Sequence, residues 1–377
     1  MPRKNGSAPA SSRQKAGGPP PLFKHQGQSI AFMDTRPRVL DASDPGCVSC
    51  DTEYLTPTGW KRIDQYTPGD LVAQFHPEHC SIEFVEPVAY IKEPCAEMVA
   101  IAPARGTSQL LSPEHRVLWY SNDKSTFGEQ SAEDFMHELH IKGPNHLNKK
   151  FMTAMRTTAT GTTGLSDAEL RVQVAFVADG HMSAKTPGSK GTVRLKKIRK
   201  VERMHSLLKA AGIEYRHRVQ PSTGFTVFRF TPPLHYKHFP NEYHGLNQHE
   251  LCVLGAEAVY WDGSFDPRPS SGRRFSSMVK SDADVVQLAW AALGASTSVH
   301  WSEHGGYQVH ASLKQLVGPG RKTSVSLTSS PDGFKYCFTV PSTFLYLRRN
   351  GRPFATGNTG KTRVQIELFA ARRAAGG

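Results

Sequence analysis

The stretch from Phe354 to Thr362, FATGNTGKT, contains half of a phosphate-binding motif. The other half lies about three hundred residues upstream, because removal of residues 47–358 joins RVLDASDPG (38–46) to TGKTRVQIELF (359–369). The joined sequence is typical of a buried apolar strand, a Gly-rich turn ending in Gly-Lys-Thr, and an amphipathic helix. In such a loop, backbone N–H groups and the helix N-terminus hold phosphates. The sequence therefore predicts a phosphate-binding loop that has been cut in two.

The residues at the two cut ends are chemically reactive. Gly46 is followed by Cys47, and Asn358 is followed by Thr359. A thiol at one junction, and an Asn followed by a hydroxyl at the other, are what peptide-bond rearrangement requires. The simpler interpretation takes each as an ordinary loop residue and the split loop as chance. Because excision restores strand, turn and helix in one register, we favour a functional role for both junctions.

The bulk composition favours a soluble chain with a polyanionic partner. The formal net charge is +13 and the pI is near 9.5, although a basic chain can also be merely soluble. No apolar run approaches the length that crosses a membrane, and residues 1–21 are basic without an apolar core, so we expect a disordered N-terminus rather than a secretory signal. The six cysteines are scattered, which fits a reducing cytoplasm, and the lone Cys47-x-x-Cys50 lacks a second pair for structural zinc.

Residues 47–75, CVSCDTEYLTPTGWKRIDQYTPGDLVAQF, are short alternating stretches broken by Pro-Thr-Gly and Pro-Gly turns, which predicts β-hairpins. This stretch resembles the first block of an intein, in which a leading Cys is followed by Asp-Thr and then by G-W and P-G-D turns. Further on, LLSPEHRVLWY (110–120) resembles the second splicing block through Ser112 and His115. The resemblance implies that Cys47 attacks the Gly46 carbonyl, assisted by Ser112 and by the His115 imidazole as a proton donor.

The stretch Tyr336–Asn358, YCFTVPSTFLYLRRNGRPFATGN, predicts two strands joined by a turn at Asn350-Gly351. It resembles the last two intein blocks, which end in Asn before a hydroxyl residue. Two positions depart from the family pattern: Gly357 stands where most inteins have His, and Phe344 stands where another His is frequent. Assistance to the cyclisation of Asn358 is therefore expected to come from elsewhere.

Cys337 stands where many inteins have Asp. Its thiol could relay the acyl group as a second nucleophile on the way to Thr359, or act as an acid near the junction. The alternative is a small buried residue on a strand, since free cysteine is among the most buried residue types. We favour a functional role, with Thr356 supporting Cys337 through a hydrogen bond.

An internal repeat lies between these blocks. Ser166 begins a capping box before an apolar helix that ends at Asp179-Gly180, and Asn247 plays the same part before a helix that ends at Asp262-Gly263. Two further helices are expected to end at Gly212 and Gly294, in the same register. Two helices packed about a pseudo-two-fold axis would bring Asp179 and Asp262 together. Paired carboxylates facing a phosphodiester can hold a divalent metal.

The repeat resembles a LAGLIDADG homing endonuclease, with VQVAFVADG (172–180) and GAEAVYWDG (255–263) as degenerate motifs. The resemblance implies that Asp179 and Asp262 bind Mg²⁺, and that Lys196 or Lys197 is the basic residue near the metal. It also implies strands that contact DNA, for which the sequence offers the Lys- and Arg-rich stretches TVRLKKIRKVER, YRHRV and SSGRRF. A run of charged residues can equally form the solvent-exposed face of a helix.

Residues 22–46 with the rejoined loop resemble the start of a superfamily-two, Snf2-like helicase. The resemblance implies that Gln26 reads adenine and that Gly360, Lys361 and Thr362 bind ATP, but only after the loop is rejoined. No downstream helicase motif is present, so we expect a fragment or truncated gene, phage-encoded, rather than a working helicase.

We therefore expect a mixed fold: an all-β horseshoe splicing domain formed by both ends of the insert, with an α+β pseudo-two-fold endonuclease inserted in it. The chain is expected to be a cytoplasmic monomer that splices without a cofactor and cleaves double-stranded DNA carrying the intein-free helicase site. The alternatives are a DNA-binding endonuclease with an inactive or cleavage-only splicing domain, and a P-loop ATPase, whose loop cannot form while interrupted. The expected parts are a disordered N-terminus (1–21), helicase fragments (22–46 and 359–377), splicing segments (47–150 and 326–358) and an endonuclease (151–325).

Overall fold

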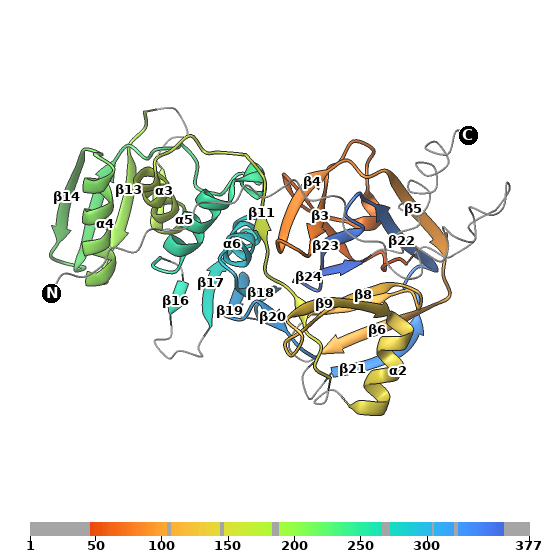
Figure 1. Ribbon diagram of the computed structural model, residues 1–377. Coiled ribbons are helices and arrows are strands. Elements are labelled where there is room, and N and C mark those ends of the chain that lie inside the picture. Colours follow the sequence, from red (N-terminus) through yellow and green to blue (C-terminus); the bar gives the residue numbers. More distant parts are fainter. Residues whose placement is uncertain are drawn as a thin grey trace, which may run out of the picture. The chain divides into compact units, whose positions relative to one another are not determined.

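The computed structural model describes residues 46–103, 107–143, 147–182, 188–261, 263–265, 272–303, 305–319 and 323–357, which belong to one compact unit (Figure 1). The predictions for Gln26, Asp262, Asn358, Thr359 and residues 360–362 lie outside the described residues. None of the helices in the described ranges is long and apolar enough to cross a membrane.

The protein has a mixed, β-rich fold, and its largest sheet combines strands from the beginning and the end of the described chain. The sheet has seven strands in the order β11-β4-β3-β23-β1-β2, with β24 paired to β23. The strands are β1 (Glu53–Thr56), β2 (Gly59–Arg62), β3 (Val72–His76), β4 (Ser81–Val85), β11 (Arg156–Thr157), β23 (Phe344–Arg349) and β24 (Arg352–Gly357). Only β11 and β4 pair in parallel among these strands.

The turn between β23 and β24 confirms the predicted hairpin. Arg349 pairs with Arg352, so the turn consists of Asn350 and Gly351. Both residues have positive φ, at 50° and 66°, as a two-residue type I′ turn requires. Any side chain at 351 would also collide with the main chain, because a Cβ built there lies 1.9 Å from the Val299 carbonyl oxygen.

The smaller sheets repeat this pairing of early and late strands. β22 pairs with β5, and β6 lies between β21 and β7, while β8 pairs with β9 and β10 with β20. Their bounds are β5 (Ala89–Pro94), β6 (Glu97–Pro103), β7 (Gln109–Leu111), β8 (Arg116–Ser121), β9 (Thr126–Ser131), β10 (Phe151–Met152), β20 (Leu316–Val317), β21 (Thr323–Ser329) and β22 (Phe334–Thr339). A short 3-10 helix, η1 (Ile63–Gln65), follows β2.

One element corrects the expectation of an all-β structure in residues 47–150, namely the helix α2 (Ala132–Lys142). Its local sequence explains it. Ser131 accepts a hydrogen bond from the Asp134 N–H at 3.0 Å, and Gly143 ends the helix with a φ of 74°. Phe135 and Leu139 lie on its buried face and join the apolar core.

The central residues form two copies of one unit, which confirms the predicted repeat. The first copy contains α3 (Asp167–Asp179), β12 (Gly180–Met182), β13 (Gly191–Leu195), α4 (Ile198–Ala210), β14 (Tyr215–Gln220) and β15 (Phe225–Phe230). The second contains α5 (Gln248–Ala258), β16 (Gly263–Phe265), β17 (Arg273–Ser277), α6 (Lys280–Ala292), β18 (Ser296–Trp301) and β19 (Tyr307–Ser312). The sheets have equivalent orders, β12-β13-β15-β14 and β16-β17-β19-β18. The 3-10 helix η2 (Asn241–Gly245) lies between the copies.

The helix ends of the repeat also follow the sequence. Ser166 and Glu169 form a reciprocal capping box on α3, and Asn247 accepts a hydrogen bond from the Glu250 N–H on α5. Gly212 and Gly294 follow α4 and α6 with φ values of 64° and 83°. In Figure 1, α3 and α5 lie side by side, and the buried Glu257 on α5 forms ion pairs with Arg171 on α3 and with Arg203 on α4.

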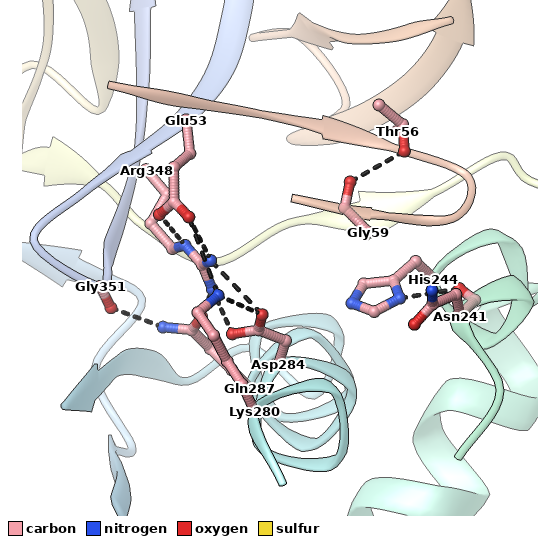
Figure 2. Close-up of polar contacts among 10 residues, drawn as sticks. All are labelled: Glu53, Thr56, Gly59, Asn241, His244, Lys280, Asp284, Gln287, Arg348 and Gly351. Carbon is pink, nitrogen blue, oxygen red and sulfur yellow. Dashed lines mark hydrogen bonds and ion pairs between the residues drawn. The ribbon is translucent and has the colours of Figure 1, made fainter. Parts of the chain in front are cut away.

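The repeat packs against the seven-stranded sheet through a buried arginine, Arg348 on β23 (Figure 2). Its Nε donates to Glu53 on β1 at 2.6 Å, and its Nη1 donates to Asp284 on α6 at 2.6 Å. The guanidinium also lies over the Trp60 ring, 4.4 Å from the centroid. Burial alone would lower the pKa of Arg348, but Asp284 and Glu53 outweigh it and raise the pKa. Gln287 completes the contact by donating to the Gly351 carbonyl at 2.7 Å.

Replacement of Arg348 by Met should lower the free energy of unfolding by about 3 kcal/mol, because it leaves the buried carboxylate of Asp284 and the half-buried carboxylate of Glu53 with only the half-exposed Lys280 as a cationic partner. Urea denaturation measures this change. The control is Arg62→Met, which removes the exposed ion pair with Asp64 and should cost about 1 kcal/mol or less. Equal losses in the two variants would contradict a dominant role for the buried cluster.

Candidate functional site

Cys47 lies on a segment that enters between β7 and β22. The Val48 N–H donates to the Tyr336 carbonyl at 2.8 Å, and the Ser49 N–H donates to the Leu110 carbonyl at 3.1 Å. Cys47 is completely buried, as is its neighbour on β22, Cys337, apart from 1% of its surface. Main-chain pairing therefore fixes the bond between Gly46 and Cys47 inside the protein.

Ser112 holds Cys47 by two hydrogen bonds. The Cys47 N–H donates to Ser112 Oγ at 2.9 Å, and the Ser112 N–H donates to the Cys47 carbonyl at 2.9 Å. The nitrogen in the first contact belongs to the Gly46–Cys47 peptide bond. Ser112 thus orients the peptide unit that the sequence predicts to react.

His115 connects this junction to the end of β24. Its Nε2 lies 2.7 Å from Thr356 Oγ1, and both side chains are fully buried. Burial lowers the pKa of His115 to about 3, although the Gly46 carbonyl acts in the opposite direction. The imidazole is therefore neutral at physiological pH, with one ring nitrogen available as an acceptor and the other as a donor.

The neighbouring Cys337 thiol, together with burial, raises the pKa of Cys47. The nearby Lys335 acts in the opposite direction but does not reverse the shift. Cys337 Sγ also donates to the Phe338 carbonyl at 3.5 Å. In this resting arrangement Cys47 is a protonated thiol, and a base must accept its proton before the sulfur becomes a strong nucleophile.

The structure brings together five of the predicted residues: Cys47, Ser112, His115, Cys337 and Thr356. One predicted contact differs, because the hydroxyl of Thr356 bonds to His115 and to the Arg116 carbonyl, at 2.7 and 3.4 Å, rather than to Cys337. Pairing with β23 holds β24 against β8, and this brings Thr356 next to His115. The contact depends on strand pairing between distant segments, which a short sequence motif does not specify.

Sequence reasoning missed Arg116, which directly follows His115 at the start of β8. Its side chain is 8% exposed, and its Nη1 forms an ion pair at 2.8 Å with Glu129 Oε2 on the neighbouring strand β9. The sequence feature that could have identified Arg116 is a charged residue within the mostly apolar stretch HRVLWY (115–120). Burying a cation costs free energy unless it is paired, so a charged residue on a buried strand indicates a specific partner.

In the repeat, Asp179 ends α3 and forms an ion pair with Lys200 in the first turn of α4. Lys200 therefore occupies the position that the sequence analysis assigned to Lys196 or Lys197. Lys196 instead lies over the Phe225 ring, 5.9 Å from its centroid, and Lys197 is the exposed N-cap residue of α4. Lys200 belongs to the same basic run and could have been found by its place one turn into the helix.

The described residues contain no group of three or more His, Cys, Asp or Glu side chains arranged to hold a metal ion. Asp179 provides a carboxylate, the ligand type that Mg²⁺ prefers, and the second predicted ligand, Asp262, lies outside the described residues. Asp179 thus fits one half of a divalent-metal site, and Lys200 neutralises its charge in this structure.

Two strands of the repeat present basic side chains to solvent. Arg216 and Arg218 are exposed on β14 of the first sheet, and Arg274 is exposed on β17 of the second sheet. The predicted basic stretch that begins at Thr192 is split, because its first residues form β13 and the rest form α4. These exposed guanidinium groups have the charge and geometry to contact phosphates.

No protein-family model matches the sequence, and no curated protein matches it. The chain is similar to the solved structure of the AceL NrdHF class 3 split intein, with 11% identity over 83% of this chain and 98% of that chain and a TM-score of 0.34. It is also similar to I-DmoI in complex with DNA and Mn, with 14% identity over 39% of this chain and 90% of that chain and a TM-score of 0.29. A third similar structure is full-length DUF199/WhiA from Thermatoga maritima, with 9% identity over 40% of this chain and 52% of that chain and a TM-score of 0.29. With TM-scores this low, function has to be inferred from the contacts within the chain itself.

The depressed pKa of His115 predicts a specific pH dependence. Between the folded value of about 3 and the ordinary value of 6.5, the unfolded chain binds the proton and the folded chain does not, so His115 destabilises the fold as pH falls through this range. The stability difference between the wild type and His115→Gln should therefore be smaller at about pH 5 than at about pH 7.5. Urea denaturation at the two pH values measures it.

The control is Thr356→Val, which removes the hydroxyl partner of His115 but keeps the imidazole. Its stability difference from the wild type should lack the pH dependence that the loss of the imidazole produces. If His115→Gln gave the same difference from the wild type at both pH values, a neutral buried His115 would be contradicted.

Proposed function

We propose that residues 47–358 are an intein that excises itself and joins Gly46 to Thr359, which restores a phosphate-binding loop of a Snf2-like helicase. The observation that carries the proposal is the hydrogen-bonded connection from the Cys47 amide to Ser112, and from His115 to Thr356. It joins two positions that lie more than three hundred residues apart in the sequence and next to the two reactive junctions. In this proposal ATP binding by Gln26, Gly360, Lys361 and Thr362 begins only after splicing.

The first step would move the Gly46 acyl group from nitrogen to sulfur. Cys47 Sγ forms a bond to the Gly46 carbonyl carbon, the bond from that carbon to the Cys47 nitrogen breaks, and the thiol proton is transferred to this nitrogen. The low pKa of His115 makes the protonated imidazole a strong acid, which suits delivery of a proton to this nitrogen, although it makes the neutral ring a weak base. Ser112 keeps the nitrogen oriented through its contact at 2.9 Å.

The later steps would pass the acyl group to the Thr359 hydroxyl, either directly or through Cys337. The pairing of Val48 with Tyr336 supports the second route, since it brings the segment of Cys47 next to the strand that carries the Cys337 thiol. Asn358 then cyclises and releases the segment, and an O-to-N shift joins Gly46 to Thr359. Splicing of this kind needs no cofactor. In this division the splicing part comprises residues 47–150 and 326–358.

We further propose that the repeat within residues 151–325 is a LAGLIDADG homing endonuclease that cleaves both strands of DNA carrying the uninterrupted helicase site. Asp179 at the end of α3, the repeated helix-and-sheet unit and the exposed arginines on β14 and β17 support this proposal. A bound Mg²⁺ would supply an activated water and stabilise the leaving oxygen. Lys200 can compensate phosphate charge once the Asp179 carboxylate has turned towards its ligand.

Splicing predicts a defined pair of products. Purified or refolded full-length chain should yield the excised 47–358 species together with the ligated 1–46/359–377 peptide, detected by intact mass over time. Cys47→Ala should abolish both products, because it removes the sulfur that carries the acyl group. Cys252→Ala, a thiol on α5 outside the site, should leave both unchanged. Free flanks without the ligated peptide would instead indicate a cleavage-only domain.

DNA cleavage gives a separate test. With Mg²⁺, the chain should cut a duplex made by deleting codons 47–358 from its own gene and leave the undeleted gene intact. Asp179→Asn should reduce the rate by more than about 100-fold, because ligand loss exceeds the effect of losing an outer-shell partner. The control is Asp167→Asn, an exposed carboxylate at the other end of α3. Equal rates in the two variants would remove Asp179 from the reaction.

A further inference from the structure

The turn of the β23–β24 hairpin is held by the repeat. The Gly351 carbonyl accepts a hydrogen bond from the Gln287 side-chain amide at 2.7 Å and another from the Val299 N–H at 2.9 Å. Both donors belong to the second copy of the repeat, Gln287 on α6 and Val299 on β18. The repeat therefore contacts the splicing part at the point where the hairpin reverses its direction.

Gln287 bonds to both sides of this turn (Figure 2). Its Oε1 accepts a hydrogen bond from Arg348 Nη1 at 2.9 Å, while its Nε2 donates to Gly351. The Gln287 side chain is fully buried, so solvent does not compete for either bond. One side chain of the repeat thus fixes the end of β23 together with the turn that follows it.

The far end of the same hairpin carries Thr356. This residue pairs with Leu345 on β23, and its hydroxyl lies 2.7 Å from His115 Nε2. The turn of a hairpin sets its register, and a slip of one residue would move the Thr356 hydroxyl to the opposite face of the strand. The turn requires Asn350 at a φ of 50°, a conformation that a non-glycine residue keeps when its surroundings hold it. Contacts that hold the turn therefore also hold Thr356 beside His115.

We propose that Gln287 is a positioning residue for the reaction at Cys47, so that the repeat is part of the splicing machinery as well as an inserted nuclease. This inference rests on the proposed splicing function. Gln287 fixes the turn, the turn fixes the register of β23 and β24, and the register brings Thr356 to His115. The imidazole of His115 is the group proposed to deliver a proton to the Cys47 nitrogen.

Release of residues 1–46 from the full chain by dithiothreitol, followed by intact mass, reports the thioester at Cys47. Gln287→Met keeps the size of the side chain but removes both hydrogen bonds. It should slow this release by about 10-fold or more, because a small displacement of a reacting group has effects of this size.

The matched control is Gln173→Met on α3. Gln173 is also fully buried and bonds to main-chain groups, but these lie between the two copies of the repeat. This variant should release residues 1–46 within about twofold of the parent rate, since its contacts are independent of the hairpin. Urea denaturation establishes that each variant is folded under the assay conditions.

A double-mutant cycle distinguishes positioning from general destabilisation. Thr356→Val should slow the release, and adding Gln287→Met should slow it further by no more than about twofold, because both changes disturb the same contact. If Gln287→Met does not fold, Gln287→Glu takes its place, since its carboxylate still accepts from Arg348 but cannot donate to Gly351. Slowing that multiplies in the double variant would show a general structural role and overturn the proposal.

Release at the parent rate in Gln287→Met, or an equal loss of rate in Gln173→Met, would also overturn the proposal while leaving the splicing function intact. A parent chain that yields neither residues 1–46 nor the ligated peptide would disprove splicing itself, and the role of Gln287 would fall with it.

Discussion

The structure depends on main-chain pairing between the first and the last part of the described chain. β23 pairs with β1 and β3, β22 pairs with β5, and Val48 bridges Tyr336. Buried N–H and C=O groups must find partners, so neither part can form its core without the other. The strands that connect to the central repeat are also paired: β10 and β11 precede the repeat and pair with β20 and β4, and β20 follows the repeat. An insertion of that size is therefore compatible with a site built from both ends.

Two buried arginines use the same physical chemistry for different purposes. Arg348 is surrounded by Glu53, Asp284 and Gln287, which come from the large sheet and from the repeat, and its contacts fix how these parts pack. Arg116 has one carboxylate partner, Glu129, and a carbonyl, and it faces a glycine at the end of β24. The cation of Arg348 therefore suits a structural role, whereas Arg116 lies at the end of β24 beside Gly357.

Low dielectric surroundings set the protonation states at the first junction. Burial holds His115 neutral, and the neighbouring thiol with burial holds Cys47 protonated. A resting site with these protonation states holds no reactive thiolate, so any reaction of Cys47 would begin with loss of its thiol proton. In the repeat, in contrast, the candidate group Asp179 is partly exposed and forms an ion pair with Lys200.

Much of the fold was determined by local sequence, because caps, turns and repeats act over few residues. The capping box at Ser166, the turn at Asn350-Gly351 and the doubled helix-and-sheet unit were all predicted and are present, and α2 was missed although its cap at Ser131 is equally local. The candidate residues at the two junctions could also be proposed from their types. What only the tertiary structure decided is which side chains meet: Thr356 bonds to His115, Lys200 replaces Lys196 and Lys197 beside Asp179, and Arg116 reaches Gly357. The physical reason is that these contacts depend on strand register and helix packing between residues far apart in sequence, which no short motif encodes.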